Sequence, residues 1–210
     1  MTKLLIFDLD NTIFDTHTIS RKEVASLLKK FEIVAIEKYG AEKTEKIIEE
    51  FWQDSFDVIA KKYQFSERLI TEFANALNNT RFDLKIQPFA DFALIKKLEY
   101  DKILVTTGFK KFQESKIKAL GIENIFSAIY IDDILSPEQT SKKHIFLKIL
   151  KENSFSPKQI IVIGDKSEAE LKAGFELGFT TIQVSKKGQN KSKYADYNIS
   201  DFAELACILS

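Results

Sequence analysis

Two carboxylic acids, Asp8 and Asp10, directly follow a run of four apolar residues at positions 4–7. The run does not alternate between apolar and polar residues, so it predicts a β-strand that is covered on both faces. Two carboxylates at the end of such a strand repel each other and lose hydration, which costs stability unless something offsets their charge. We therefore expect a cation at this point that the amino-acid sequence does not itself supply.

Two other predicted strands also end in polar residues. Residues 101–108 (DKILVTTG) end in Thr-Thr-Gly, and residues 159–165 (QIIVIGD) end in Asp165. Ligands of open parallel sheets bind outside the carboxyl ends of the strands, so these residues are expected to lie near the paired acids. Taken singly, Asp165 is equally well explained as a helix cap or turn residue, and Thr-Thr-Gly as a turn. The paired acids are much harder to explain in that way.

Strand and helix patterns alternate along most of the remaining chain. Further strands are predicted at residues 126–132 and 180–185, and helices at 109–121, 141–152 and 168–178. Strands that alternate with helices form right-handed crossovers and a parallel sheet. The sequence thus predicts an α/β fold, with a Rossmann-like parallel sheet that carries helices on both faces.

An all-helical block interrupts this alternation just after the first strand. Apolar residues recur at helical spacing in three consecutive segments. These segments are residues 19–39, 43–63 and 66–77. We therefore predict an inserted helical cap subdomain at residues 16–84, with a core domain formed by residues 1–15 and 85–210.

Composition limits the classes of function that the chain could have. Its 210 residues suit one domain of moderate size or a domain with an insertion, and 44% apolar residues allow a sizeable core. The 31 basic and 31 acidic residues give no reason to expect nucleic acid or an acidic membrane as a partner. A single cysteine, Cys207, fits a reducing compartment. Because no membrane span or leader is evident, a cytoplasmic location is expected.

The polar strand ends resemble, in order and spacing, the motifs of the haloacid dehalogenase-like hydrolase superfamily. Residues 8–12 (DLDNT) resemble the first motif, residues 105–108 (VTTG) the second, and residues 161–170 (IVIGDKSEAE) the fourth. The resemblance extends over essentially the whole chain. The helical block resembles the alpha-helical cap of the subfamily that inserts its cap after the first motif.

The resemblance implies a phosphatase that works through an aspartyl-phosphate intermediate. Asp8 would be the nucleophile that attacks phosphorus, and Asp10 would be the general acid and then the general base. Thr106 would hydrogen-bond a phosphoryl oxygen. Thr107 and Gly108 would bind the substrate through backbone amides alone.

The resemblance also implies a Mg²⁺ site, because carboxylates, a carbonyl and water suit this ion. The expected ligands are the side chain of Asp8, the backbone carbonyl of Asp10 and the side chain of Asp165. Glu170 would stand behind them and orient Asp165 or a metal-bound water. Mg²⁺ is thus the cation expected beside the paired acids.

The third motif departs from the family pattern. Relatives often have a lysine followed by proline near the start of a helix, whereas this chain has Lys142 and Lys143 without a proline. The distance to Phe146 favours Lys142 as the residue that neutralises charge and keeps Asp8 ionised. Most lysines are solvated surface residues, and this alternative stays open for both.

The same residues also bear on three other functions that this fold could have. Dehalogenases do not need the second acid, because halide leaves without a proton, so Asp10 favours a phosphate ester. A sugar-phosphate mutase uses the same residues and is not excluded. A catalytically inactive binding or scaffold protein is disfavoured, because the reactive side chains are all present.

The substrate is expected to be a small phosphorylated metabolite, for example a nucleotide or a sugar phosphate. No nucleic acid or membrane partner is expected, and the chain is expected to be a monomer or homodimer. Specificity should come from the cap. Its candidate contact residues are Arg21, Lys22, Trp52, Tyr63 and Arg81.

Overall fold

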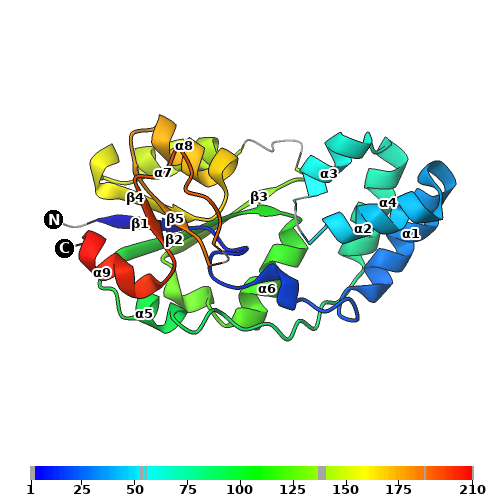
Figure 1. Ribbon diagram of the computed structural model, residues 1–210, viewed down its shortest axis with the longest axis horizontal. Helices are drawn as coiled ribbons and strands as arrows, with labels where there is room; N and C mark the ends of the chain where they lie inside the picture. The colour runs from blue at the N-terminus through cyan, green and yellow to red at the C-terminus, as the bar shows by residue number, and fades with distance from the viewer. Residues whose placement is uncertain (1–2, 53, 55, 137–140, 187, 210) are drawn as a thin grey trace.

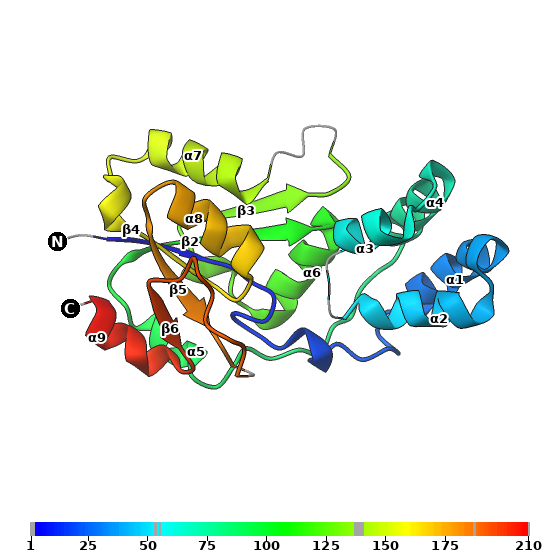
Figure 2. The same ribbon diagram turned by 45° about the horizontal axis from the view of Figure 1, so that its top comes forward.

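The computed structural model describes residues 3–52, 54, 56–136, 141–186 and 188–209. Within these residues, a parallel sheet with its covering helices forms one part of the molecule, and a group of helices forms the other (Figure 1). The strands point toward the helix group, which therefore lies beyond their carboxyl ends (Figure 2). The predicted site falls between the two parts.

The strands run parallel in the order β3-β2-β1-β4-β5-β6. They are β1 (Leu4–Phe7), β2 (Asp101–Gly108), β3 (Ala128–Asp133), β4 (Ile160–Gly164), β5 (Thr180–Val184) and β6 (Tyr197–Ile199). The predicted Rossmann-like α/β sheet is confirmed. Because the strand order reverses between β1 and β4, the crevice outside their carboxyl ends is where such folds bind ligands.

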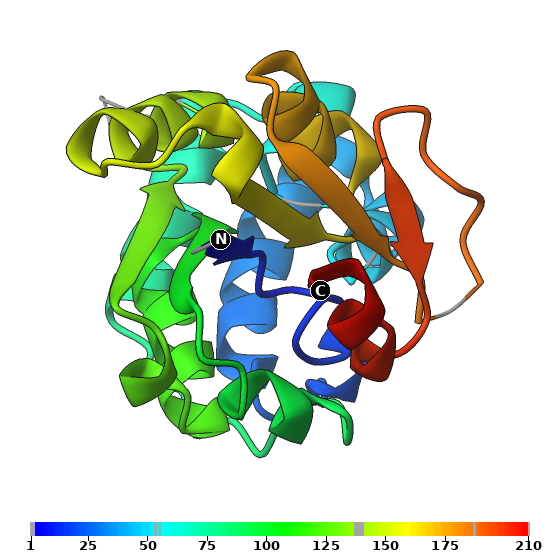
Figure 3. The ribbon, with the colours of Figure 1, turned by 90° about the vertical axis from the view of Figure 1, so that its left-hand side faces the viewer.

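Each face of the sheet has its own hydrophobic core, because alternate strand residues point to opposite faces. Leu5 and Phe7 join one cluster of buried residues, and Leu4 and Ile6 join the other. The first cluster is covered by α5 (Phe92–Lys96), α6 (Lys110–Leu120) and α9 (Leu205–Leu209), and the second by α7 (Lys142–Glu152) and α8 (Lys172–Glu176) (Figure 3). The prediction of helices on both faces is confirmed.

The helix group encloses a third cluster that is rich in aromatic side chains. Its helices are α1 (Ala25–Tyr39), α2 (Ala41–Glu50), α3 (Phe56–Tyr63) and α4 (Glu67–Asn78). The ring of Phe31 contacts the rings of Phe51, Phe65 and Phe73 at centroid distances of 5.0, 5.5 and 5.5 Å. Offset and edge-to-face contacts of this kind stabilise a core beyond the burial of area.

Two of the helices predicted for this group have different bounds. The helix predicted over residues 19–39 begins only at Ala25, and the helix predicted over 43–63 is divided into α2 and α3. The rings of Phe51 and Phe56 stack at 5.9 Å, and both rings also stack on Phe73. Residues five apart do not share a face of one continuous helix, so a turn is needed to bring both rings together.

Apolar contacts join the two parts of the molecule. Four residues that flank the helix group belong to a cluster of the sheet: Ile19, Val24, Leu84 and Ile86. In the other direction, Phe109 packs into the helix group, with its ring 4.8 Å from Phe56 and 5.3 Å from Phe73. The division of the chain into a sheet domain and a cap at residues 16–84 stays a prediction.

The sequence analysis did not predict α5, β6 or α9. Each has three to five residues. Segments of this length are too short to show a hydrophobic period, so their pattern does not separate helix from strand or loop. In the described part of the chain, no helix is both long and apolar enough to cross a membrane.

Replacing Phe31 by alanine is expected to lower the free energy of unfolding by about 3–5 kcal/mol, because a large buried ring leaves a cavity. Ile33→Ala on the same helix is the matched control, since Phe31 is 1% exposed and Ile33 is 61% exposed. The control should change stability by less than about 0.5 kcal/mol. Urea unfolding followed by circular dichroism measures both, and equal losses would contradict the packing described for α1.

Candidate active site

The chain turns sharply after β1, and Asn11 makes the turn possible. The backbone N–H of Asp8 still follows the sheet and donates to the carbonyl of Ile163 at 2.9 Å. Asn11 has a φ of +57°, a left-handed conformation that asparagine tolerates better than most residues. Its side-chain oxygen accepts hydrogen bonds from the N–H and the hydroxyl of Thr16 at 3.2 and 2.8 Å. These bonds fix the loop that carries Asp10.

Lys142 lies between two buried carboxylates. Its Nζ is 2.5 Å from Asp8 Oδ1 and 2.7 Å from Glu170 Oε2, and all three side chains are buried. Lys143 points elsewhere and pairs with the partly exposed Glu176 at 2.6 Å. The structure therefore brings Lys142, rather than Lys143, to the first predicted acid.

Asp8, Asp165 and Glu170 form a cluster of acids. One carboxylate oxygen from each lies within 4.8 Å of the others. Asp165 Oδ1 is buried without a hydrogen-bond partner in the described structure, which is costly for a polar atom. An all-oxygen donor set with an unsatisfied oxygen fits Mg²⁺. Glu170 is the least available ligand, because its oxygens already accept from Lys142 and from the N–H of Lys166 at 2.7 Å each.

The position of Glu170 depends on the backbone that follows β4. Ser167–Leu171 forms one π-helical turn before α8, a distortion that often occurs at functional sites. Glu170 packs so closely against Gly164 that a Cβ atom at this glycine would collide with its side chain. A glycine at the end of β4 is therefore required by the approach of Glu170, and it cannot be exchanged for alanine without a shift.

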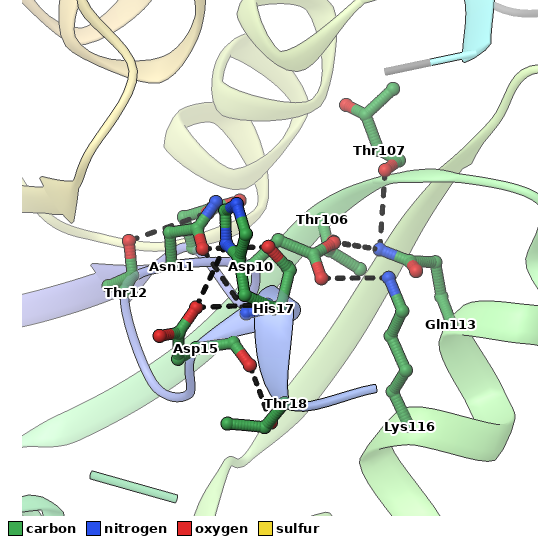
Figure 4. A network of polar contacts seen from close by, with 12 residues as sticks. Asp10, Asn11, Thr12, Asp15, His17, Thr18, Thr106, Thr107, Gln113 and Lys116 are labelled. Carbon is green, nitrogen blue, oxygen red and sulfur yellow. Dashed lines mark hydrogen bonds and ion pairs between the residues drawn. The ribbon is translucent and has the colours of Figure 1, made fainter. Parts of the chain in front are cut away.

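The side chain of Asp10 contacts two residues of α6. One of its oxygens is 2.7 Å from Nζ of Lys116, and the other accepts from Nε2 of Gln113 at 2.8 Å (Figure 4). The same amide nitrogen is 2.5 Å from the hydroxyl oxygen of Thr106 and 3.2 Å from the carbonyl oxygen of Thr107. Gln113 therefore links the second predicted acid to the end of β2.

Sequence reasoning missed Gln113 and Lys116, although a signal was present. Both residues lie on the buried stripe of α6, at helical spacing with Ile117 and Leu120. A polar residue on the buried face of a helix needs a partner inside the protein. Glutamine and lysine at two such positions therefore indicate a buried polar group opposite the helix, and this group is the carboxylate of Asp10.

The three residues at the end of β2 line the same crevice. Thr106 is buried, and because its oxygen accepts from Gln113, its own hydrogen remains available to donate. The hydroxyl of Thr107 donates to Asp132 at 3.3 Å. Gly108 has a φ of +155°, and a Cβ atom there would lie 3.0 Å from the side chain of Gln113, so glycine suits this position.

A cavity of about 990 Å³ opens between the carboxyl ends of the strands and the helix group. Asp8, Asp10, Thr106 and Lys142 line it from the sheet side, together with Thr107 and Gly108. Asp165 and Glu170 are not among its described lining residues. Of the five candidate contact residues of the helix group, only Trp52 is among them.

The motif order, the parallel sheet and the site geometry agree with one family. The sequence profile of haloacid dehalogenase-like hydrolases matches residues 5–184. The chain belongs to the haloacid dehalogenase-like hydrolase family. The resemblance drawn from the three strand ends is thereby confirmed.

Relatives of this haloacid dehalogenase-like (HAD) hydrolase align over nearly its whole length. A glyceraldehyde 3-phosphate phosphatase from Pyrococcus furiosus is 25% identical, over 99% of this chain and 92% of that protein. An N-acylneuraminate-9-phosphatase from Mus musculus is 24% identical, over 99% and 93%. Among solved structures, the HAD-hydrolase YfnB from Bacillus subtilis bound to magnesium has a TM-score of 0.62 and 19% identity, over 100% of this chain and 99% of that one.

The acid cluster of this HAD hydrolase has unusual affinities for protons. Burial raises the pKa of Asp8 to about 7, although the charge of Lys142 opposes the shift. Burial and the charges of Glu170 and Asp8 raise the pKa of Asp165 to about 8. Burial acts to lower the pKa of Lys142, but the charges of Asp8 and Glu170 outweigh it and raise that pKa above its ordinary value. A divalent cation would favour the ionised carboxylates instead.

The raised pKa values predict how pH and Mg²⁺ act together on stability. Without metal, the folded protein keeps protons on Asp8 and Asp165 that the unfolded chain has lost, so its stability falls as pH rises toward the pKa values of about 7 and about 8. A Mg²⁺ ion at this cluster would bind the ionised form, so adding the metal should raise Tm more at about pH 8.5 than at about pH 5.5. Differential scanning fluorimetry measures this difference.

The matched control for this measurement is Asp165→Asn. It removes one predicted ligand charge and should abolish most of the Mg²⁺-dependent rise in Tm. A rise of the same size at both pH values, or an unchanged rise in the variant, would contradict a metal site at the acid cluster.

Proposed function

We propose that the chain is a Mg²⁺-dependent phosphatase that hydrolyses a small phosphorylated metabolite through an aspartyl-phosphate on Asp8. The placement of Asp8 carries the proposal: it lines the cavity, is held by Lys142, and shares an acid cluster with Asp165, whose buried Oδ1 has no hydrogen-bond partner in the described structure. The two relatives named above as phosphatases support this activity. The single cysteine of the chain supports a cytoplasmic location.

In the first step, an Asp8 oxygen attacks phosphorus while the bond between phosphorus and the ester oxygen breaks. Asp10, on the same wall of the cavity, gives its proton to the departing oxygen. In the second step, Asp10 takes a proton from water, which attacks the phosphorus and releases Asp8 and inorganic phosphate.

The residues around Asp8 stabilise charge during both steps. The Lys142 ammonium neutralises negative charge on Asp8 and the phosphoryl group, and the hydroxyl of Thr106 donates to a phosphoryl oxygen. Asp8 and Asp165, with the backbone carbonyl of Asp10, would hold Mg²⁺, and Glu170 would orient Asp165. When bound, Mg²⁺ offsets the repulsion between the carboxylate and the phosphate dianion.

Gln113 and Lys116 give Asp10 a fixed position relative to Thr106. Both donate to the Asp10 carboxylate, and Gln113 also contacts the Thr106 hydroxyl. The acid that serves the leaving oxygen and the hydroxyl that binds the phosphoryl group are thus held by one amide. Catalysis depends on such fixed placement, because small displacements of reacting groups cost much of the rate.

We further propose that residues 16–84 act as a cap. The helix group forms the wall of the cavity opposite Asp8. Closure of this wall over the substrate would exclude water and strengthen the electrostatic contacts inside. The magnesium-bound structure of Bacillus subtilis YfnB reveals interdomain movement in that protein, which supports a mobile cap here.

The proposed activity is tested with p-nitrophenyl phosphate in the presence and absence of Mg²⁺. Release of p-nitrophenol should require the metal, and Asp8→Asn should lower kcat by at least about 10³-fold, because an amide cannot form the acyl phosphate. Circular dichroism confirms that the variant is folded. Near-wild-type turnover by Asp8→Asn, or no metal-dependent turnover by the wild type, would contradict the proposed mechanism. Transfer of phosphate between sugar phosphates would instead identify a mutase.

Lys142 and Lys143 form a matched pair for a second test. Lys142→Ala should lower kcat by about 10²–10³-fold, the usual cost of losing a charge stabiliser in the transition state. Lys143→Ala should change kcat little, because this lysine pairs with Glu176 near the surface. Steady-state kinetics on folded protein compares them, and a larger loss in Lys143→Ala would rule out the proposed role of Lys142.

A further inference from the structure

The wall of the cavity that faces the proposed nucleophile is strongly apolar. Large side chains of the helix group line it, and several are only partly buried. Those that bear on the argument are Leu28, Phe51, Trp52, Phe56 and Val58. Val58 is 47% exposed. Apolar surface that faces water is unfavourable in proportion to its area, so a ligand that covers this wall would gain binding energy.

The described residues of the same wall carry negative charge and no positive charge. Among the described residues of 16–84 that line the cavity, the ionisable ones are Asp54 and Asp57, and both are exposed. Arg21, which was a candidate contact, instead pairs with Glu49 at 3.3 Å and lies over the ring of Trp52. A carboxylate on the substrate would meet acids at this wall and find no cation to pair with.

The positive charges of the cavity lie at its other end, on the sheet side. Four of its lysines are already paired with acids: Lys116 with Asp10, Lys142 with Asp8, Lys143 with Glu176 and Lys172 with Glu168. Lys166 also lines the cavity, directly after Asp165 and thus beside the phosphoryl site. Positive charge is therefore placed for the phosphate, and the helix group offers none to the alcohol part of the substrate.

We infer that the alcohol part of the substrate is uncharged and carries a flat or otherwise hydrophobic ring, as in a nucleoside monophosphate. This inference rests on the proposed phosphatase activity. A cavity of about 990 Å³ has room for such a ring, since pockets for drug-sized ligands measure ~300–1,000 Å³. A triose would leave the apolar wall uncovered, and an acidic sugar would bring its carboxylate to Asp54 and Asp57. The cavity thus favours a substrate unlike those in the names of the two relatives.

The inference is tested with three phosphate monoesters of primary alcohols that differ in the group they present to the wall. They are 2-phenylethyl phosphate, propyl phosphate and the phosphate ester of 3-hydroxypropanoate. The ring should raise kcat/KM by about tenfold or more relative to the propyl ester, because its burial on the wall is favourable. The carboxylate should lower kcat/KM below that of the propyl ester. Glyceraldehyde 3-phosphate should also be a poorer substrate than the phenylethyl ester.

Val58→Lys places a cation on the apolar wall and should reverse part of this order. It should raise kcat/KM for the carboxylate ester relative to the propyl ester, and Asp57→Asn should do the same to a smaller extent. Ile33→Lys is the matched control, because Ile33 is 61% exposed and is not among the described lining residues. The control should leave the ratio of the two esters unchanged.

The outcomes separate this inference from the activity on which it rests. If the wild type hydrolyses p-nitrophenyl phosphate but handles the three esters equally, or prefers the carboxylate ester or the triose phosphate, the inferred substrate class is wrong and the phosphatase activity stands. An unchanged ester ratio in Val58→Lys likewise overturns the inference alone. If the wild type hydrolyses none of the esters, including p-nitrophenyl phosphate, both are wrong.

Discussion

The contact of one lysine with two buried acids is the constraint that organises this molecule. Lys142 Nζ lies 2.5 Å from Asp8 and 2.7 Å from Glu170, and Asp165 lies beside them. Removing Lys142 from such a group would leave uncompensated negative charge in a region of low dielectric, which is strongly unfavourable. The end of β1, the start of α7 and the π-helical turn after β4 must therefore meet at one point. The group still holds more acid than base, and this excess is a negative charge that a divalent cation would offset.

The strands and the acids at their ends could be predicted because the signals are local. Residues 101–108 form β2 as predicted, and the run before Asp8 forms a strand buried on both faces. The spacing to Phe146 also favoured Lys142, the lysine that contacts Asp8 in the structure. The break between α2 and α3 could not be predicted in this way. It depends on the position of Phe73, farther along the chain, because the rings of Phe51 and Phe56 both stack on it.

The contacts of Asp10 show the limit of reading motifs alone. The motif points to Asp10 but not to the side chains that hold it, and those come from a helix that begins about a hundred positions later. Gln113 and Lys116 could be noticed only as polar residues on a stripe that should be apolar, and their partner was evident only after folding. The same applies to Gly164. That this position must be glycine is evident only in the folded protein, where the side chain of Glu170 occupies the space of a Cβ atom.

Helix α6 touches both parts of the molecule within a single turn. Phe109, just before its first residue, packs among the aromatic rings of the helix group, and Gln113, four residues later, holds Asp10 and Thr106. A helix is stiff over so short a distance, so a displacement of those rings is expected to shift Asp10 and Thr106 as well. Substitutions in the aromatic cluster are therefore expected to change the positions of these two side chains. A relative in which this cluster changes to fit another ligand would therefore also have to keep the contacts of α6 with Asp10.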